Sequence, residues 1–572
     1  MKKDSFSYSL DFFFYSVAIL IGYFFFAYNG KFIIDDFSIV NSRKTLNLFE
    51  YYKSLESTFS NRPLAIVYYF VISKLPNNYL LYFTINLFQH CLCIFLIYKL
   101  FDFLFYSEVL KKIFFLLIIF PFFSFTTLYS PAMQSIGNFS LVIFLFALTL
   151  LKKFIIEKKK YLYALSIVLI ILAFLTYESF FPLIVLFIFF PLIYKQNYKI
   201  VFANFFLILI ISLIIFFFQK YLATKPEGED LSRIRNLNIF SLLRLCFVNL
   251  LLLINFFLEN FYDAFENIKN LANKKLYFAL IQIIFFNFIF VYLIFKLKRR
   301  PLTNIKAFKI YSIIISVIFL IILMHSIADT GIDFRDYNNR GMLAMSFVPS
   351  ILLLLLYNSN LKNNYIIFFK FFFIFFYCSI ITNFFSFQQY EYAKLDKFKK
   401  VYLTVKENNL INNKTFLFIK TEPQNYIEYK YSYSSSNYFY NFMQEDRDYL
   451  NQIVTKNNLN YKEINQFIDI YDFTFVFSSK LAFCKYYLIS DDVLKKHSNF
   501  IILNGAEETY ARLNLSQLKE ALYNEKNKNC INEFELLIKK LFAKDKKYLD
   551  EKNIPLLIKN LYIYNLIKYI FY

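Results

Sequence analysis

Glycine is scarce in this chain, which has seven glycines among 572 residues. The phosphate-binding fingerprints of dinucleotide-binding and P-loop proteins need several glycines at fixed short spacings, and no segment of the chain supplies them. The six cysteines have none of the paired spacings that ligate zinc. The sequence therefore excludes both types of nucleotide-binding motif and a cysteine-based metal centre.

Tryptophan is absent, although the chain has 80 phenylalanines and 48 tyrosines. This bias, together with many Lys, Asn and Ile residues, is typical of AT-rich codon usage, so the richness in Phe is not evidence of an aromatic binding surface. The formal net charge is +22. The lysines cluster between long apolar runs, and this arrangement orients a membrane protein rather than binding nucleic acid. We therefore expect lipid around the chain and no nucleic-acid partner.

Apolar runs of about twenty residues, the length that crosses a bilayer core, recur through the first two thirds of the chain. Hydrophobic residues make up 58% of the sequence, far more than one soluble domain can bury. No small-residue cleavage site follows the first run, so we interpret it as a retained span. The predicted spans are approximately 9–28, 79–99, 112–128, 136–151, 160–176, 180–194, 200–219, 276–296, 306–327, 341–357 and 364–384.

Two further apolar segments are ambiguous. Lys74 and Pro76 cut short the segment 64–75, and Arg244 interrupts the segment 240–258. Leaving both as re-entrant or interface-lying helices places nearly every basic cluster on one side of the membrane. The positive-inside rule then predicts about eleven spans, with the N-terminus inside and the C-terminus outside. The inner clusters are Lys99 with Lys111 and Lys112, Lys152 to Lys160, Lys195 with Lys199, Lys296 to Arg300, and Lys362.

A small set of segments is predicted to lie on the outer face of the membrane. They are the loops 29–62, 129–135, 220–275 and 328–340, the turn at Tyr177-Glu178, and the chain after about 385. Beyond residue 384 the hydropathy falls, and short β-like runs at 415–419, 473–477, 486–489 and 500–503 alternate with helical patterns. The predicted fold class is an all-α polytopic membrane bundle over 1–384, followed by a soluble extracytoplasmic α/β domain over 385–572.

Three carboxylates on the predicted outer face are candidate catalytic residues. Asp35 and Asp36 follow the first span closely. They are either solvated loop residues or a general base with a neighbour that orders it or holds a divalent cation. Glu178 lies between two apolar runs, where an acid is costly unless it is paired or faces a wet cavity.

Three arginines and a histidine are candidate substrate-binding residues. Arg62 precedes Pro63, a residue that suits the first turn of a helix. The Arg62 side chain either snorkels to lipid head groups or binds a phosphate through two N–H groups of its guanidinium. Arg335 and Arg340 open the tenth predicted span from outside, where they either anchor the helix or bind an anionic head group. His90 lies within a span, where a lone histidine is usually an interhelical hydrogen-bond donor.

Taken in order, these segments resemble the GT-C superfamily of membrane glycosyltransferases. Families with this layout include the bacterial O-antigen-modifying glucosyltransferases of the GtrII type and the protein O-mannosyltransferase-like enzymes. The chain departs from the common pattern at Tyr177, where a Lys often precedes the Glu, and in lacking Gly-rich stretches. The resemblance rests on Asp35-Asp36 after the first span, Asn61-Arg62-Pro63-Leu64, the helix with Asn86 and His90, Leu172-Ala173 with Tyr177-Glu178 and Pro182, and Arg340 before a late span.

The resemblance implies a GT-C bundle in the bacterial inner membrane that uses an undecaprenyl- or dolichyl-phosphate sugar as donor. The acceptor would be a hydroxyl of an exported glycan, lipid or protein. The implied reaction is one in-line displacement at the anomeric carbon, with Asp35 or Asp36 taking the acceptor proton. Arg62, Arg335 and Arg340 would stabilise the departing lipid phosphate.

Two other functions stay open. A transporter or flippase for lipid-linked glycans would share the spans and the external basic residues, but it should show internal repeats and helices broken at the midplane. The sequence has no convincing repeat. A polysaccharide polymerase or ligase is chemically close to the transferase, and the sequence does not separate the two.

Overall fold

The computed structural model describes most of the first 388 residues and a few short segments beyond them. The described residues are 5–24, 46–59, 62–76, 78–105, 107–120, 132, 135–194, 198–222, 239–273, 276–297, 304–327, 348–357, 365, 367–386, 388, 415–420, 499–504, 509–514, 516–517, 558 and 561.

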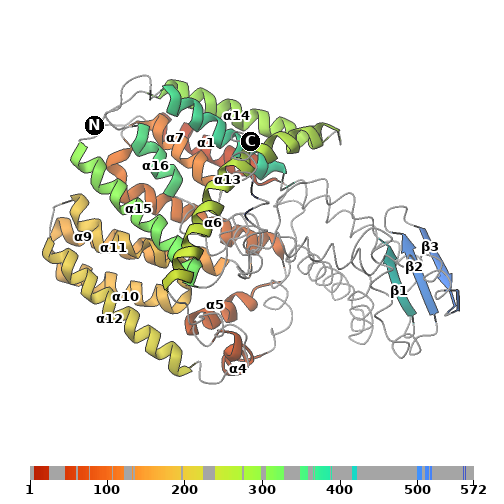
Figure 1. Ribbon diagram of the computed structural model, residues 1–572, viewed down its shortest axis with the longest axis horizontal. Coiled ribbons are helices and arrows are strands. Elements are labelled where there is room, and N and C mark those ends of the chain that lie inside the picture. Colours follow the sequence, from red (N-terminus) through yellow and green to blue (C-terminus); the bar gives the residue numbers. More distant parts are fainter. Residues whose placement is uncertain are drawn as a thin grey trace.

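Helices make up almost all of the described part before residue 388 (Figure 1). The longer ones are α6 (Tyr79–Leu100), α9 (Ser135–Glu157), α12 (Tyr198–Leu222), α13 (Ile239–Asn273), α14 (Tyr277–Lys296), α15 (Asn304–Ile327) and an unlabelled helix, Ile367–Ser386. The shorter ones are α1 (Ser5–Gly22), α4 (Leu48–Phe59), α5 (Pro63–Ser73), α7 (Glu108–Ile119), α10 (Lys160–Thr176), α11 (Ile184–Tyr194), α16 (Val348–Tyr357) and the 3-10 helices Asp102–Leu104 and Glu178–Leu183.

Six of these helices are long and apolar enough to cross a membrane. They are α6, α9, α13, α14, Ile367–Ser386 and Phe308–Ile327 within α15. Large apolar side chains are exposed on their outer faces, such as Phe288 on α14 at 70% of its surface. A face of this kind is stable against lipid chains and not against water. In its described part the chain is therefore a helical, multi-pass membrane protein, as predicted.

Helices α6 and α9 run in the same direction. In their first halves Asn138 Nδ2 donates to Asn86 Oδ1 at 2.8 Å. Where they end, Lys152 Nζ donates to the carbonyl of Lys99 at 2.6 Å and pairs with Asp102 at 2.9 Å. We call the end of the bundle that carries Lys99 and Lys152 the basic end. We call the opposite end, toward which Asn86 and Asn138 lie, the polar end.

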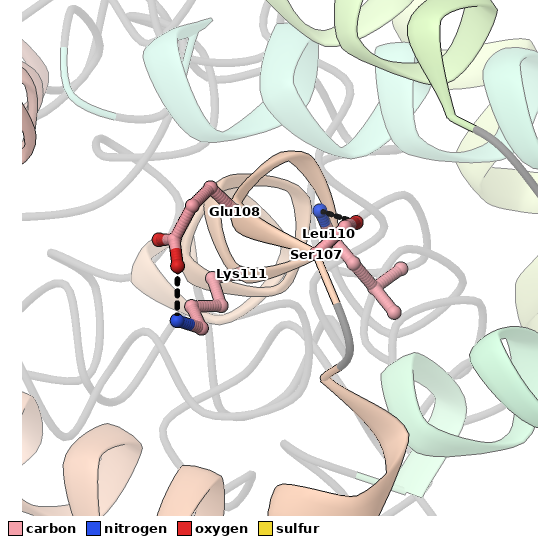
Figure 2. Close-up of polar contacts among 4 residues, drawn as sticks. All are labelled: Ser107, Glu108, Leu110 and Lys111. Carbon is pink, nitrogen blue, oxygen red and sulfur yellow. Dashed lines mark hydrogen bonds and ion pairs between the residues drawn. The ribbon is translucent and has the colours of Figure 1, made fainter. Parts of the chain in front are cut away.

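Helix α7 starts at the basic end and runs back toward the polar end. Ser107 caps its first turn by accepting from the backbone N–H of Leu110 at 3.2 Å, and Lys111 pairs with Glu108, as Figure 2 shows. Lys111 also lies 5.8 Å from the ring centroid of Tyr98 near the end of α6. The N-cap serine accepts from a backbone N–H of the first turn, and the glutamate in that turn interacts favourably with the helix dipole. A new helix can therefore begin a few residues after α6 ends.

The next three helices continue this alternation. Helix α10 ends at the polar end, because Ser140 in the first turns of α9 donates to the carbonyl of Tyr177 at 2.8 Å. Helix α11 returns to the basic end, where the Tyr194 hydroxyl donates to the carbonyl of Leu100 at 2.5 Å. Helix α12 starts beside it and runs back, with Asn204 Nδ2 donating to the carbonyl of Phe187 at 2.8 Å.

The late helices alternate in the same way. Helix α14 starts beside the end of α1, where Gln282 Nε2 donates to the carbonyl of Ile21 at 2.7 Å. Helix α15 starts at the basic end, where Lys309 Nζ lies 3.5 Å from the carbonyl of Leu192. The helix Ile367–Ser386 runs antiparallel to α14, since Phe373 stacks on Phe290 and Phe385 stacks on Phe286. It therefore ends beside the end of α1.

Helices α5 and α13 do not join this alternation. Helix α5 has 11 residues and lies across the polar end, where Tyr68 donates to Ser135 Oγ at 2.9 Å and Tyr82 donates to the carbonyl of Ile72 at 2.8 Å. Helix α13 has 35 residues and runs across the direction of α10 and α12 in Figure 1. Its Asn249 donates to Ser326 in the last turn of α15 at 3.0 Å.

The described residues beyond 388 include three strands. They are β1 (Thr415–Lys420), β2 (Asn499–Asn504) and β3 (Thr509–Leu513), in the order β1-β2-β3, with β1 parallel to β2 and β2 antiparallel to β3. The predicted β-runs at 415–419 and 500–503 are thus strands, while those at 473–477 and 486–489 lie outside the described residues. The soluble α/β domain over 385–572 stays a prediction.

Candidate functional site

The predicted site residues divide into those that the structure describes and those that it does not. Arg62 and His90 are described with their side chains, and Glu178 is described through its backbone. Asp35, Asp36, Arg335 and Arg340 lie outside the described residues. The geometry of the site is therefore built from Arg62, His90, the turn at Glu178, and the positions where the segment carrying Asp35 and Asp36 is attached.

Arg62 is held at the polar end by an aromatic ring. It stands at the start of α5, directly before Pro63, and its backbone carbonyl accepts from Ala65 N–H at 2.9 Å. Its guanidinium carbon lies 4.6 Å from the ring centroid of Tyr177, within the range of a cation–π contact. Arg62 is half-buried and Tyr177 is buried. The contact joins α5 to the end of α10.

The turn that carries Glu178 is fixed through its neighbour. Tyr177 leaves α10 with an extended backbone, its N–H donates to the carbonyl of Ala173 at 3.0 Å, and its carbonyl accepts from Ser140. Glu178 then begins the 3-10 helix Glu178–Leu183. The structure thus brings together Arg62 and the Tyr177-Glu178 pair, which are far apart in the sequence. The cation of Arg62 thus lies over the ring of Tyr177, the residue directly before Glu178.

The segment that carries Asp35 and Asp36 is attached to the polar end at both of its ends. On one side Gln282 Nε2 donates to the carbonyl of Ile21 at 2.7 Å, and Gln388 Nε2 donates to that of Gly22 at 2.6 Å. On the other side Lys74 Nζ donates to the carbonyl of Leu46 at 2.7 Å. The last residues before the segment and the first after it are therefore tied to the end of the bundle that carries Arg62.

His90 is buried between helices. Its Nε2 lies 3.0 Å from the carbonyl of Ile118, near the end of α7, so the ring joins α6 to α7. Asn86, one turn earlier on α6, bonds to Asn138 of α9. This geometry is that of an interhelical hydrogen bond in a membrane bundle. A direct contact between His90 and substrate stays a prediction.

Sequence reasoning missed a set of buried polar residues on α13. They are Asn255, Glu259, Asn260, Asp263 and Asn267, and none exposes more than 5% of its surface. The apolar segment 240–258, predicted as a re-entrant or interface-lying helix within the outer segment 220–275, is part of a longer helix that spans residues 239–273. The missed signal was the recurrence of Asn, Glu and Asp at helical spacing, which marks one polar face of a helix.

The comparisons with known proteins identify no relative. No protein family matches the chain, no curated protein matches it, and no solved structure matches its fold. Within the described residues there is no group of three or more His, Cys, Asp and Glu side chains that could hold a metal ion. The class of this protein, a helical multi-pass membrane protein, thus rests on its own sequence and geometry.

Proposed function

We propose that the chain is a membrane glycosyltransferase that moves a sugar from a polyprenyl-phosphate donor to a hydroxyl of an exported glycan, lipid or protein. The observation that carries the proposal is the contact of Arg62 with Tyr177, directly beside Glu178. It puts a guanidinium and a carboxylate-bearing turn at the end of the bundle to which the segment with Asp35 and Asp36 is attached. A displacement at a sugar phosphate needs a cation for the leaving group and a base for the acceptor.

The roles of the residues follow from this chemistry. Asp35 or Asp36 takes the proton of the acceptor hydroxyl as its oxygen attacks the anomeric carbon, and the bond to the lipid phosphate breaks. Arg62, with Arg335 and Arg340 from the segment before α16, stabilises the negative charge on the departing phosphate. Glu178 is the alternative base. A divalent cation at Asp35 and Asp36 would be a further source of charge stabilisation.

The proposed topology supports placing the chemistry outside the cytoplasm. Taking α5 and α13 as helices that lie at the membrane surface leaves about eleven crossing segments, with the N-terminus inside. The basic end, with Lys99, Lys111 and Lys152, then faces the cytoplasm of a bacterial inner membrane. The crossing segments are α1, α6, α7, α9, α10, the segment 178–194, α12, α14, α15, α16 and Ile367–Ser386.

The test is transfer of label from radiolabelled polyprenyl-phosphate hexoses to an extractable acceptor in membranes that contain the chain. We expect Asp35→Asn or Asp36→Asn to lower the rate by about a hundred- to ten-thousand-fold, the usual cost of removing a general base. Loss of a solvated surface aspartate changes stability by about 0.5 kcal/mol or less, so expression and thermal stability should stay near wild type. Near-normal turnover in both variants would leave Glu178 as the leading candidate for the base.

A transporter or flippase for lipid-linked glycans is the main alternative, with a polymerase or ligase next. A transporter of the repeat type binds its substrate at helices broken near the bilayer midplane. Two buried asparagine pairs of the described helices lie instead toward the polar end, namely Asn138 with Asn86 and Asn383 with Asn260. Export of an unchanged lipid-linked sugar from reconstituted vesicles, without transfer to an acceptor, would favour the transporter.

A further inference from the structure

Helix α13 is amphipathic in the opposite sense to a surface helix of a water-soluble protein. Its buried face carries the five polar residues named above, which fall on one side at 3.6 residues per turn. Its other face exposes Phe247, Leu250, Ile254, Phe265 and Ile268. A helix in contact with lipid turns its apolar face outward and keeps its polar groups for protein or ligand.

The buried face is joined to the end of the helix Ile367–Ser386. Asn383 Nδ2 donates to Asn260 Oδ1 at 2.6 Å and to the carbonyl of Asn260 at 3.0 Å, and Asn267 Nδ2 donates to Asn383 Oδ1 at 3.0 Å. Two atoms of this chain of amides, the Asn260 Nδ2 donor and the Asn267 Oδ1 acceptor, have no hydrogen-bond partner among the described residues. Both side chains are buried, with 2% and 0% of their surfaces exposed.

The two atoms restrict the kind of ligand that completes this face. Buried polar atoms without a partner are rare in folded proteins and call for a ligand, water or ion. A metal cation does not suit an amide N–H, which points a positive hydrogen at it. A hydroxyl group both donates and accepts, so a polyhydroxylated ligand matches a donor and an acceptor on the same face. The buried Asp263 Oδ2 adds a carboxylate acceptor to this face, whereas Glu259 Oε1 accepts from Asn255 Nδ2.

We propose that the buried face of α13, together with Asn383, binds the sugar ring of the lipid-linked substrate. This inference rests on the proposed function, because that function identifies the sugar as part of a polyprenyl-phosphate donor. The position fits the reaction, because Asn383 is followed by Phe384, whose ring lies 5.5 Å from that of Tyr23. Tyr23 stands before the segment that carries Asp35 and Asp36, so the sugar would lie at the end of the bundle to which that segment is attached.

The experiment measures binding without turnover. The full chain is placed in phospholipid nanodiscs free of glycolipids and alkyl-glycoside detergents. Equilibrium binding is then compared for radiolabelled farnesyl phosphate and for farnesyl phosphates that carry one glucose, galactose, mannose or N-acetylglucosamine. We expect wild type to bind at least one sugar-bearing probe about tenfold more tightly than the bare lipid phosphate, as one or two added hydrogen bonds allow.

The variants test whether α13 provides this difference. Asn260→Leu and Asn267→Leu should remove most of it and change the affinity for bare farnesyl phosphate by no more than about twofold. If either leucine variant fails to fold, the isosteric Asp263→Asn should show the same loss. Asn204→Leu is the matched control, because Asn204 is a buried asparagine of α12 that bonds to Phe187 and Tyr163. It should lower thermal stability and keep the preference for the sugar.

The outcomes separate this inference from the proposed function. Equal affinity of wild type for the bare and all sugar-bearing lipids, or variants that keep the preference, would overturn the sugar site alone. Sugar-dependent binding that needs Asn260 and Asn267, without transfer to any acceptor, would support the site and contradict the transferase. Absence of binding to every probe would overturn both.

Discussion

At the residue scale, the contact between Arg62 and Tyr177 explains how a cation is positioned at the polar end. A cation–π contact can use the face of a guanidinium, whereas the N–H fork that binds phosphate lies in the guanidinium plane. The two interactions are therefore compatible. Lysine could supply the charge at this position, but it would lose both the flat stacking surface and the fork.

Replacing Arg62 should weaken donor binding more than it slows the chemical step. We expect Arg62→Ala to raise the KM for the polyprenyl-phosphate sugar by about ten- to a hundredfold, because a hydrogen-bonded charge is worth about 1.5–3 kcal/mol. Arg62→Lys should recover part of this loss, and Tyr177→Leu should have a smaller effect in the same direction. Steady-state kinetics in membranes would measure these changes.

The matched control is Lys296→Ala, which removes a similar cation–ring contact, with Tyr292 at 4.5 Å, at the end of α14 away from the polar end. It should leave KM unchanged. If Arg62→Ala and Lys296→Ala behaved alike, Arg62 would be a lipid anchor and the phosphate role would be wrong.

At the element scale, α13 shows why length and hydropathy do not by themselves make a helix cross a membrane. Its 35 residues extend about 52 Å at 1.5 Å each, more than enough to cross. Asn249, however, bonds to the last turn of α15, and Asn267 bonds to the last turns of Ile367–Ser386. Both of these helices end at the polar end. Asn249 and Asn267, which are far apart along α13, therefore both lie at the polar end of the bundle.

Cysteine labelling tests the position of α13. In a background without the six native cysteines, Ile239→Cys and Asn273→Cys should both react with an impermeant maleimide in spheroplasts. Both positions are exposed and stand at opposite ends of α13. Tyr198→Cys, at the exposed start of α12 by the basic end, is the control and should react only after lysis. Labelling of just one end of α13 would show that it crosses.

At the scale of the whole molecule, a group of ion pairs and the chain of amides on α13 lie at opposite ends of the bundle. Three ion pairs, Lys111–Glu108, Lys152–Asp102 and Lys159–Glu157, lie at the basic end. Lysines at one end of a membrane bundle set its orientation through the positive-inside rule. The other end carries Arg62, the chain of amides on α13, and both attachments of the segment with Asp35 and Asp36.

The orientation of the whole bundle has its own test. Lys153→Cys and Lys158→Cys, exposed at the turn between α9 and α10, should react with the impermeant maleimide only after lysis. Lys53→Cys, exposed on α4 at the polar end, should react in spheroplasts. Labelling of Lys153→Cys from outside would reverse the orientation and remove the basis for an external active face.

The sequence alone determined the properties that depend on local composition. Apolar runs at 79–99, 136–151 and 276–296 predicted helices α6, α9 and α14, because crossing a bilayer sets a minimum length and hydropathy for one continuous segment. The segment 64–75, cut short by Lys74 and Pro76, was ambiguous in the sequence, and the structure shows a helix of 11 residues there. Arg62 and Glu178 could each be selected from residue type and position in the chain.

Only the tertiary structure decided which of these residues meet. Arg62 and Tyr177 are more than a hundred residues apart in the sequence, and their contact depends on the packing of α5 across α9 and α10. The sequence analysis did not predict the buried polar face of α13 for the same reason. Hydropathy averages over all sides of a helix, whereas burial depends on the neighbours that cover one side. Local composition fixes how long and how apolar a segment is, and the packing of several helices decides what each side of it touches.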